Sequence, residues 1–335
     1  MKQQTLVSKK KKSWIISKKD FTFIDLFAGI GGFRIAAERL GGDCVYSSEW
    51  DKNSQKTYLA NFGETPAGDI TKIDEKTIPK HDILFGGFPC QAFSISGKKN
   101  GFNDTRGTLF FDIARIIKEK KPKMFLLENV KNFATHDNGR TLSLILKTLK
   151  ELDYDVFYKV LRSSDFGVPQ ARERVYIVGF KKIMKVTEFE YPEPLPESDT
   201  AVVRDILEKA LPPDAKTIDK EVISVNGKPK SDLRKPKKLG YFNKGGQGER
   251  VYSVDSAGIT LSAYGGGAAS KTGAYLVDGV VRKLSPRECA RMQGFPEDFE
   301  IPVTTNLALK QFGDSVSIPV LQAVITKMIS VAKEK

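Results

Sequence analysis

The chain has 335 residues, of which 40% are hydrophobic and 28% are charged, and this balance excludes collagen-like folds and long disordered regions. No apolar run reaches the length of a membrane helix, and no signal-peptide pattern follows the lysine-rich start. Three widely spaced cysteines exclude a disulfide framework, which favours a cytoplasmic protein. With two histidines and no CxxC motif, we expect no metal site. The net charge of +13 indicates a polyanionic partner such as nucleic acid, although some basic proteins have no such partner.

Strand-length apolar runs alternate with helical segments over the first half of the chain. The predicted strands are Phe21–Phe27, Asp43–Ser48, Asp82–Phe85, Lys123–Leu127, Val156–Leu161 and Arg174–Phe180. The predicted helices are Phe33–Leu40, Lys52–Asn61, Leu109–Lys120 and Thr141–Leu152. This alternation predicts an α/β fold with a doubly wound, mostly parallel sheet.

Composition divides the chain into four parts. Residues 1–20 form a basic tail that we expect to be solvated, with an arm along a nucleic-acid backbone as the alternative. Residues 21–195 form the larger domain and end in a proline-rich linker. Residues 196–302 form a smaller, glycine-rich domain with short β pieces at Gly258–Ala263 and Ala274–Val277. Residues 303–335 contain an apolar helix that we expect to return to the larger domain.

The first strand runs into a glycine turn, Asp25–Gly32, at the sheet edge where α/β proteins bind ligands. The dinucleotide fingerprint needs a glycine where this chain has Arg34, and the turn carries no Lys-Ser/Thr for a triphosphate. It therefore suits a nucleoside ligand such as S-adenosylmethionine. Glu49 lies about 20 residues further on, where a carboxylate can bind ribose hydroxyls. Asp69 could accept from an adenine amine, and a cap or turn is the alternative for both acids.

Three further motifs follow predicted strand ends. Cys90 follows a proline in a Gly/Ser-rich loop, where a nucleophile would sit, whereas most lone cysteines are buried apolar residues. Glu128 ends an apolar strand, where a carboxylate is costly unless it is functional or paired; capping the next helix is the alternative. Arg172 and Arg174 alternate onto one face and could hold a phosphate or a base, with a surface ion pair as the alternative.

These motifs, in this order, resemble those of the cytosine-5 DNA methyltransferases. The matching segments are Asp25–Gly32, Gly87–Ser94, Glu128–Val130, Gln170–Arg174 and Arg282–Arg291. The resemblance covers nearly the whole chain from Phe21 and extends into the variable region at Lys244–Arg250 and Thr260–Gly267. The target that it implies is GCGC, modified at the inner cytosine. The implied setting is a restriction-modification system, and a monomer is the default.

The resemblance also implies the chemistry. A Cys90 thiolate adds to C6 of a flipped cytosine, Glu128 binds the base, and Arg172 orients the base or the nucleophile beside Arg174. The residues expected to bind S-adenosylmethionine are Phe27, Ala28, Gly29, Gly31, Gly32, Glu49, Trp50, Asp69, Ile70, Pro89, Leu109, Asp314 and Ser315. The residues expected to contact double-stranded DNA are Gln91, Ser94, Ser96, Gln247, Arg250, Thr260, Tyr264 and Gly267.

Two other functions compete with this one. An RNA cytosine-5 methyltransferase of the tRNA-modifying branch would carry a Cys-Phe-Thr signature that the chain lacks. A DNA-binding module with weakened catalysis is favoured only by Asp314, which stands where the family usually has asparagine. The second domain would contact DNA through basic residues such as those of Lys228–Lys238, which could equally be solvated surface.

Overall fold

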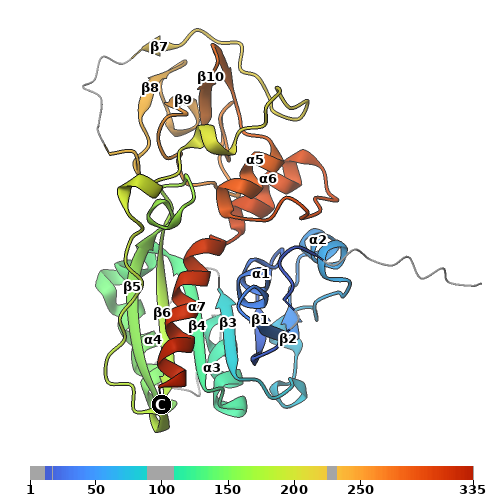
Figure 1. Cartoon of the computed structure of the whole chain (residues 1–335), viewed down its shortest axis with the longest axis vertical. Helices are drawn as coiled ribbons and strands as arrows, with labels where there is room; N and C mark the ends of the chain where they lie inside the picture. Colours follow the sequence, from blue (N-terminus) through green and yellow to red (C-terminus); the bar gives the residue numbers. More distant parts are fainter. Residues whose placement is uncertain (1–11, 17, 89–108, 225–231, 335) are drawn as a thin grey trace, which may run out of the picture.

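The computed structural model describes residues 12–16, 18–88, 109–224 and 232–334. Its larger sheet has six strands in the order β2-β1-β3-β4-β6-β5 (Figure 1). The strands are β1 (Phe21–Leu26), β2 (Gly42–Ser48), β3 (Ile83–Gly87), β4 (Met124–Val130), β5 (Tyr154–Arg162) and β6 (Glu173–Lys181). Strands β1 to β4 run parallel, and β6 runs antiparallel to both of its neighbours, because the short β5–β6 connection leaves no room for a crossover helix. The predicted α/β fold with a mostly parallel sheet is confirmed.

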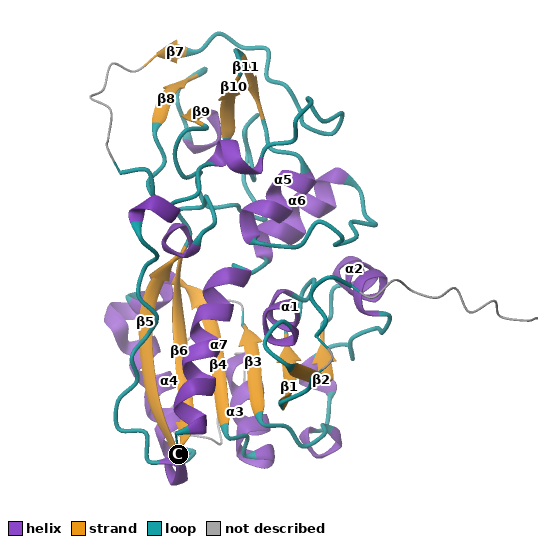
Figure 2. Cartoon of the chain, in the orientation of Figure 1, coloured by secondary structure: helices purple, strands orange, loops and turns teal. Residues whose placement is uncertain are grey.

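Helices cover both faces of this sheet (Figure 2). One apolar cluster contains side chains of α1 (Gly32–Glu38) and α7 (Ile318–Lys333). The other contains side chains of α3 (Leu109–Lys120) and α4 (Arg140–Glu151). Helix α2 (Lys52–Phe62) follows β2. Because parallel strands are buried on both faces, β1, β3 and β4 are rich in apolar residues.

The end of the chain contains a stretch, Thr305–Lys333, that is long and apolar enough to cross a membrane by length and composition alone. Its second part is α7, which has only 16 residues and packs on the same side of the sheet as α1. The apolar side chains of α7 are completely buried at Val320, Leu321, Val324, Ile325 and Met328. Burial in the protein core therefore accounts for the apolar stripe of this helix.

A second sheet of five strands lies beyond the carboxyl ends of the first. The strand order is β11-β10-β9-β8-β7, and the bounds are β7 (Ile223–Ser224), β8 (Lys238–Tyr241), β9 (Arg250–Ser253), β10 (Ala274–Val277) and β11 (Val280–Arg282). Helices α5 (Pro286–Gln293) and α6 (Thr305–Asp314) lie between the two sheets. A buried ion pair of 2.7 Å between Arg282 and Glu288 joins β11 to α5.

The structure corrects one predicted β piece. Ala274–Val277 is a strand, as predicted, but Gly258–Ala263 is not, and only Gly258 forms an isolated bridge, with Gln170. The backbone of this segment pairs with Pro169 and Ala171 at Gly258 and is bound by side chains further along. The Gln170 amide oxygen accepts from the Leu261 amide at 3.0 Å, and Arg172 donates to the Leu261 carbonyl.

The start of the described chain also differs from the prediction of a solvated tail. Trp14 is 1% exposed and packs edge-on against Phe62, and its indole nitrogen donates to Glu38 at 3.1 Å. The backbone and hydroxyl of Ser13 donate to Asp298. The sequence did not predict this packing, because the apolar stretch Trp14–Ile16 is only three residues long and lies between lysine-rich segments, so it gives no periodic signal.

Truncation of the Trp14 side chain should destabilise the fold. We expect Trp14→Ala to lower the free energy of unfolding by about 3 kcal/mol or more, because a large buried side chain leaves a cavity. Trp50→Ala is the matched control: Trp50 is 75% exposed, and its loss should cost less than about 0.5 kcal/mol. Urea unfolding followed by circular dichroism measures both, and equal midpoints would show that Trp14 does not pack in solution.

Candidate active site

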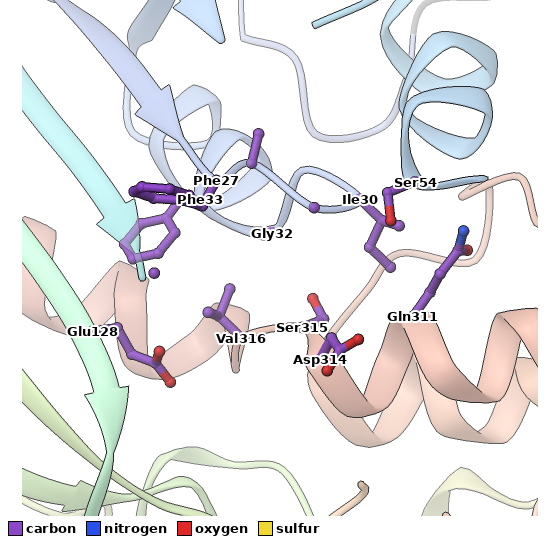
Figure 3. A pocket seen from close by; sticks show the side chains of 13 residues that line it. Phe27, Ile30, Gly32, Phe33, Ser54, Glu128, Gln311, Asp314, Ser315 and Val316 are labelled. Atoms are coloured by element: carbon purple, nitrogen blue, oxygen red, sulfur yellow. The ribbon is translucent and has the colours of Figure 1, made fainter. Parts of the chain in front are cut away.

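A cavity of about 450 Å³, its open side included, lies at the carboxyl ends of β1, β3 and β4 (Figure 3). This is the edge at which open α/β sheets bind their ligands. The cavity is lined by Phe27, Ala28, Gly29, Ile30, Gly32, Phe33, Ser54, Gly87, Glu128, Gln311, Asp314, Ser315 and Val316. The sequence motifs marked seven of these as site residues and did not mark Ile30, Phe33, Ser54, Gly87, Gln311 and Val316.

The glycines of the first turn serve two purposes. A Cβ on Gly31 would lie 2.2 Å from Phe62, and a Cβ on Gly32 would lie 2.5 Å from Val316, so these two glycines permit close packing. Gly29 has a φ of +55° and nothing within 4 Å of such a Cβ, which leaves its backbone open to a ligand. Phe27 also has a positive φ, +58°, a strained conformation for a residue that lines the cavity.

Glu49 connects the glycine turn to the start of α2. Its carboxylate accepts from the amide of Gly29 at 2.8 Å and from the amide of Asp51 at 2.7 Å. Burial raises the pKa of Glu49, and these amide hydrogen bonds oppose the shift. Each carboxylate oxygen retains a further lone pair for another donor. The carboxylate therefore orients the turn and can still bind hydroxyl groups.

Glu49 and the remaining predicted adenosine-binding residues Trp50, Asp69, Ile70 and Leu109 lie outside the cavity lining. Asp69 caps a short helical turn and accepts from the backbone and hydroxyl of Thr71, and the hydroxyl hydrogen bond lowers the pKa of Asp69. The indole of Trp50 is largely exposed. Ile70 is buried and Leu109 starts α3.

Glu128 lies near the end of β4 and faces Arg174 of β6. The Nε atom of Arg174 is 3.1 Å from Oε1 of Glu128, and both side chains are largely buried. The short helical turn after β4 has Val130 at its N-cap and no side-chain cap, so Glu128 does not cap it. The next residue, Asn129, donates to the carbonyl of Phe88 at 2.9 Å. The carboxylate therefore lines the cavity beside the point where the chain leaves β3.

Arg172 has a different environment, although it lies only two residues from Arg174. Its guanidinium donates to the carbonyls of Leu261, Gly313 and Ser315 at distances of 2.6 to 3.2 Å. Burial, together with repulsion by Arg174, lowers the pKa of Arg172 to about 10, so the group remains charged at neutral pH. It fixes the backbone on both sides of Asp314, whose side chain points into the cavity (Figure 3).

The residues predicted to contact DNA are spread over the second sheet and its loops. Gln247 and Arg250 are exposed on one short turn and the start of β9. Gly267 lies against this turn, because a Cβ placed on it would be 2.8 Å from the Gly248 carbonyl oxygen. Tyr264 is 73% exposed. Thr260 donates its hydroxyl proton to the Ala171 carbonyl at 3.0 Å.

Several predicted residues fall outside the described residues. They are Pro89, Cys90, Gln91, Ser94 and Ser96, together with the basic positions Lys228 and Lys230. Of the described basic residues nearby, Arg234 is mostly buried, lies 3.7 Å from Asp165 and donates to Thr200. Its role is therefore structural. Over the described ranges, no group of three or more His, Cys, Asp or Glu residues is placed to hold a metal ion.

Comparison with known proteins gives the family. The model of the C-5 cytosine-specific DNA methylases matches residues 21–330. The chain is 55% identical over 301 residues to the Type II methyltransferase M.HhaI of Haemophilus parahaemolyticus, covering 90% of this chain and 91% of that protein. It is 46% identical over 334 residues to M.HpaII of Haemophilus parainfluenzae, covering 93% and 90%. The chain belongs to the C-5 cytosine-specific DNA methylase family and is a DNA (cytosine-5)-methyltransferase, so the resemblance of its motifs is confirmed.

Solved structures with lower identity share the fold. The Dnmt2 methyltransferase of S. pombe aligns with a TM-score of 0.70 at 20% identity, covering 93% of this chain and 99% of that one. A putative DNA modification methyltransferase encoded within an E. coli prophage aligns with a TM-score of 0.65 at 22% identity, covering 94% and 100%. At these identities the likeness concerns the arrangement of helices and strands alone.

The buried carboxyl of Asp25, in β1 beneath the glycine turn, makes stability depend on pH. Burial raises its pKa from 3.8 to about 8, although Arg34 opposes the shift. Between these values the folded protein binds the proton more tightly than the unfolded chain does. The free energy of unfolding should therefore fall as pH rises from about 4 to 8.

Asp25→Asn removes this titration and tests the assignment. Relative to the variant, the wild type should become progressively less stable across this range, as measured by urea midpoints at pH 5, 6, 7 and 8. Asp43→Asn, at an exposed position of β2, is the control and should give a constant difference from the wild type. A constant difference for Asp25→Asn as well would contradict the raised pKa.

Proposed function

We propose that the chain binds S-adenosylmethionine in this cavity and methylates C5 of a cytosine flipped out of duplex DNA. The observation that carries the proposal is the shared cavity wall: Glu128, held by Arg174, lies across the cavity from Ser54 and Gln311. A base bound at Glu128 would thus meet a ligand bound at the glycine turn. When bound, S-adenosylmethionine supplies the electrophilic methyl group.

The described residues fit that ligand. The open backbone at Gly29 permits close approach, and the Glu49 carboxylate beside it can accept from ribose hydroxyls. No lysine or arginine lines the cavity among the described residues, whereas Glu128 and Asp314 do. A cavity lined by two carboxylates favours a cationic ligand over an anionic one.

The methyl transfer requires a nucleophile and a group that binds the base. The Cys90 thiolate would add to C6 of cytosine, so that the electron pair gained by the ring allows C5 to attack the methyl group. Glu128 would bind N3 and the exocyclic amine, which stabilises the ring as its charge changes. Removal of the C5 proton and departure of the thiolate then give 5-methylcytosine.

The contacts of Arg172 and Arg174 support roles that differ from those expected from the sequence. Arg172 uses its guanidinium on backbone carbonyls, whereas Arg174 lies against the carboxylate of Glu128. We therefore assign the base-facing role to Arg174 and a positioning role to Arg172.

The target cytosine must be flipped out of the duplex for this chemistry, because C5 and C6 cannot be reached inside a stacked duplex.

DNA would bind between the second sheet and the cavity. Gln247, Arg250 and Tyr264 are exposed there, and the net charge of +13 suits a polyanion. Arg250 is the candidate for guanine readout and Gln247 for the space left by the flipped base. We propose GCGC as the target, on the strength of the similarity to M.HhaI. We further propose a monomeric, cytoplasmic enzyme that provides the modification activity of a restriction-modification system.

Bisulfite sequencing tests reaction and target together. Unmethylated plasmid incubated with the protein and S-adenosylmethionine should become methylated at the inner cytosine of GCGC and nowhere else. Cys90→Ser should abolish methylation and retain DNA binding, because only the covalent step needs the thiolate. Methylation at another sequence would overturn the proposed target, and methylation by Cys90→Ser would overturn the nucleophile.

A second substitution tests the role of the carboxylate. Glu128→Gln keeps the shape of the side chain and removes its charge, so kcat should fall by about 10²-fold or more. The urea midpoint should fall as well, because the buried guanidinium of Arg174 loses its charged partner, so rates are compared where both proteins are folded. Glu173→Gln is the matched control, since that exposed side chain pairs with Lys131 on the surface. Comparable single-turnover rates for Glu128→Gln and the wild type would exclude Glu128 from the chemical step.

A further inference from the structure

Gln311 of α6 lines the cavity, and the sequence motifs did not identify it as a site residue. We propose that this amide binds the carboxylate of the amino-acid arm of the cofactor, so that Gln311 selects for ligands carrying that carboxylate. The proposal rests on S-adenosylmethionine being the ligand. It adds Gln311 as a cofactor-binding residue and Thr57, on α2, as a residue that positions it.

The amide oxygen of Gln311 has a hydrogen-bond partner, whereas its amide nitrogen has none among the described residues. Gln311 is 6% exposed, and its Oε1 lies 3.0 Å from the hydroxyl oxygen of Thr57. Its Nε2 atom is buried and has no hydrogen-bond partner among the described residues. An unpaired buried donor is costly, and a ligand acceptor in the cavity would remove that cost.

Thr57 sets the direction in which the amide points. Its hydroxyl has a single proton and two acceptors within reach, Gln311 Oε1 at 3.0 Å and the Asn53 carbonyl at 3.4 Å. The nearer acceptor is the Gln311 oxygen. Donation from Thr57, itself 1% exposed, holds Oε1 toward α2. The Nε2 donor is the other end of the same amide, at the side of the cavity that carries Ser54 (Figure 3).

The shape of the ligand indicates which group meets this donor. A sulfonium has three arms: adenosyl, methyl and the amino-acid chain. If Glu49 binds the ribose and the methyl group points toward the base at Glu128, the third arm must lie along the remaining wall. That wall carries Ser54, Gln311 and Asp314 (Figure 3).

The two ends of that arm have opposite charges, and α6 presents a group for each. Gln311 and Asp314 are three residues apart and so share one helix face. The amide donor suits the carboxylate, and the Asp314 carboxylate suits the ammonium. Lys310 pairs with Asp314 through Oδ2 at 3.0 Å, which leaves Oδ1 for the ligand.

Calorimetric binding of three thioethers tests the proposal. S-adenosylhomocysteine has the complete arm, S-adenosyl-3-thiopropylamine lacks only the carboxylate, and 5′-deoxy-5′-methylthioadenosine lacks both charges. Gln311→Leu should weaken S-adenosylhomocysteine about tenfold or more and change the other two Kd values less than about twofold. An equal loss for all three ligands, or no loss for S-adenosylhomocysteine, would overturn the proposal.

Further variants separate recognition from misfolding. Gln311→Glu is nearly isosteric and should repel the carboxylate, which weakens S-adenosylhomocysteine but not S-adenosyl-3-thiopropylamine. Thr57→Val should weaken S-adenosylhomocysteine severalfold and Thr57→Ser should not, because serine keeps the hydroxyl. If the wild type binds 5′-deoxy-5′-methylthioadenosine but does not discriminate among the arms, only the Gln311 proposal fails. If it binds none of the three, the S-adenosylmethionine site fails as well.

Discussion

Hydrogen bonds from the buried guanidinium of Arg172 hold together the segments that surround the cavity. The carbonyls of Leu261, Gly313 and Ser315 come from two separate stretches of chain and converge on this one cation. The contact leaves no spare room, since a Cβ on Gly313 would lie 2.3 Å from the backbone of Ser262. The positions of Asp314 and Ser315 in the cavity wall, and of the loop that contains Leu261, therefore depend on this one charged group.

The strand that follows, β6, supplies the arginine that pairs with Glu128. Arg174 lies two residues beyond Arg172, and its partner Glu128 is held on the neighbouring strand β4. One arginine therefore holds the loop segments beside the cavity, while the other lies against the carboxylate. Arg174 belongs to β6 and Arg172 to the loop just before it, so only two residues of backbone separate the two contacts.

Local pattern was sufficient for the features that depend on neighbours in the sequence. The glycine turn, the strand that ends in Glu128 and the αβ alternation all follow from spacing and from the burial of parallel strands. Patterns could not separate the two arginines, because alternation places both on one face and only the distant carbonyls distinguish them. Gln311 and Trp14 were missed for the same reason: their partners, Thr57 and Glu38, lie on other helices.

The segment Gly258–Ala263 lies between strands of the second sheet in the sequence but is also bonded to the loop that precedes β6. Its backbone bonds to Gln170, Ala171 and Arg172, and the Thr260 hydroxyl donates to the Ala171 carbonyl. Recombination between related genes that exchanged the whole stretch after the linker would therefore break these attachments unless the two parents matched at both places.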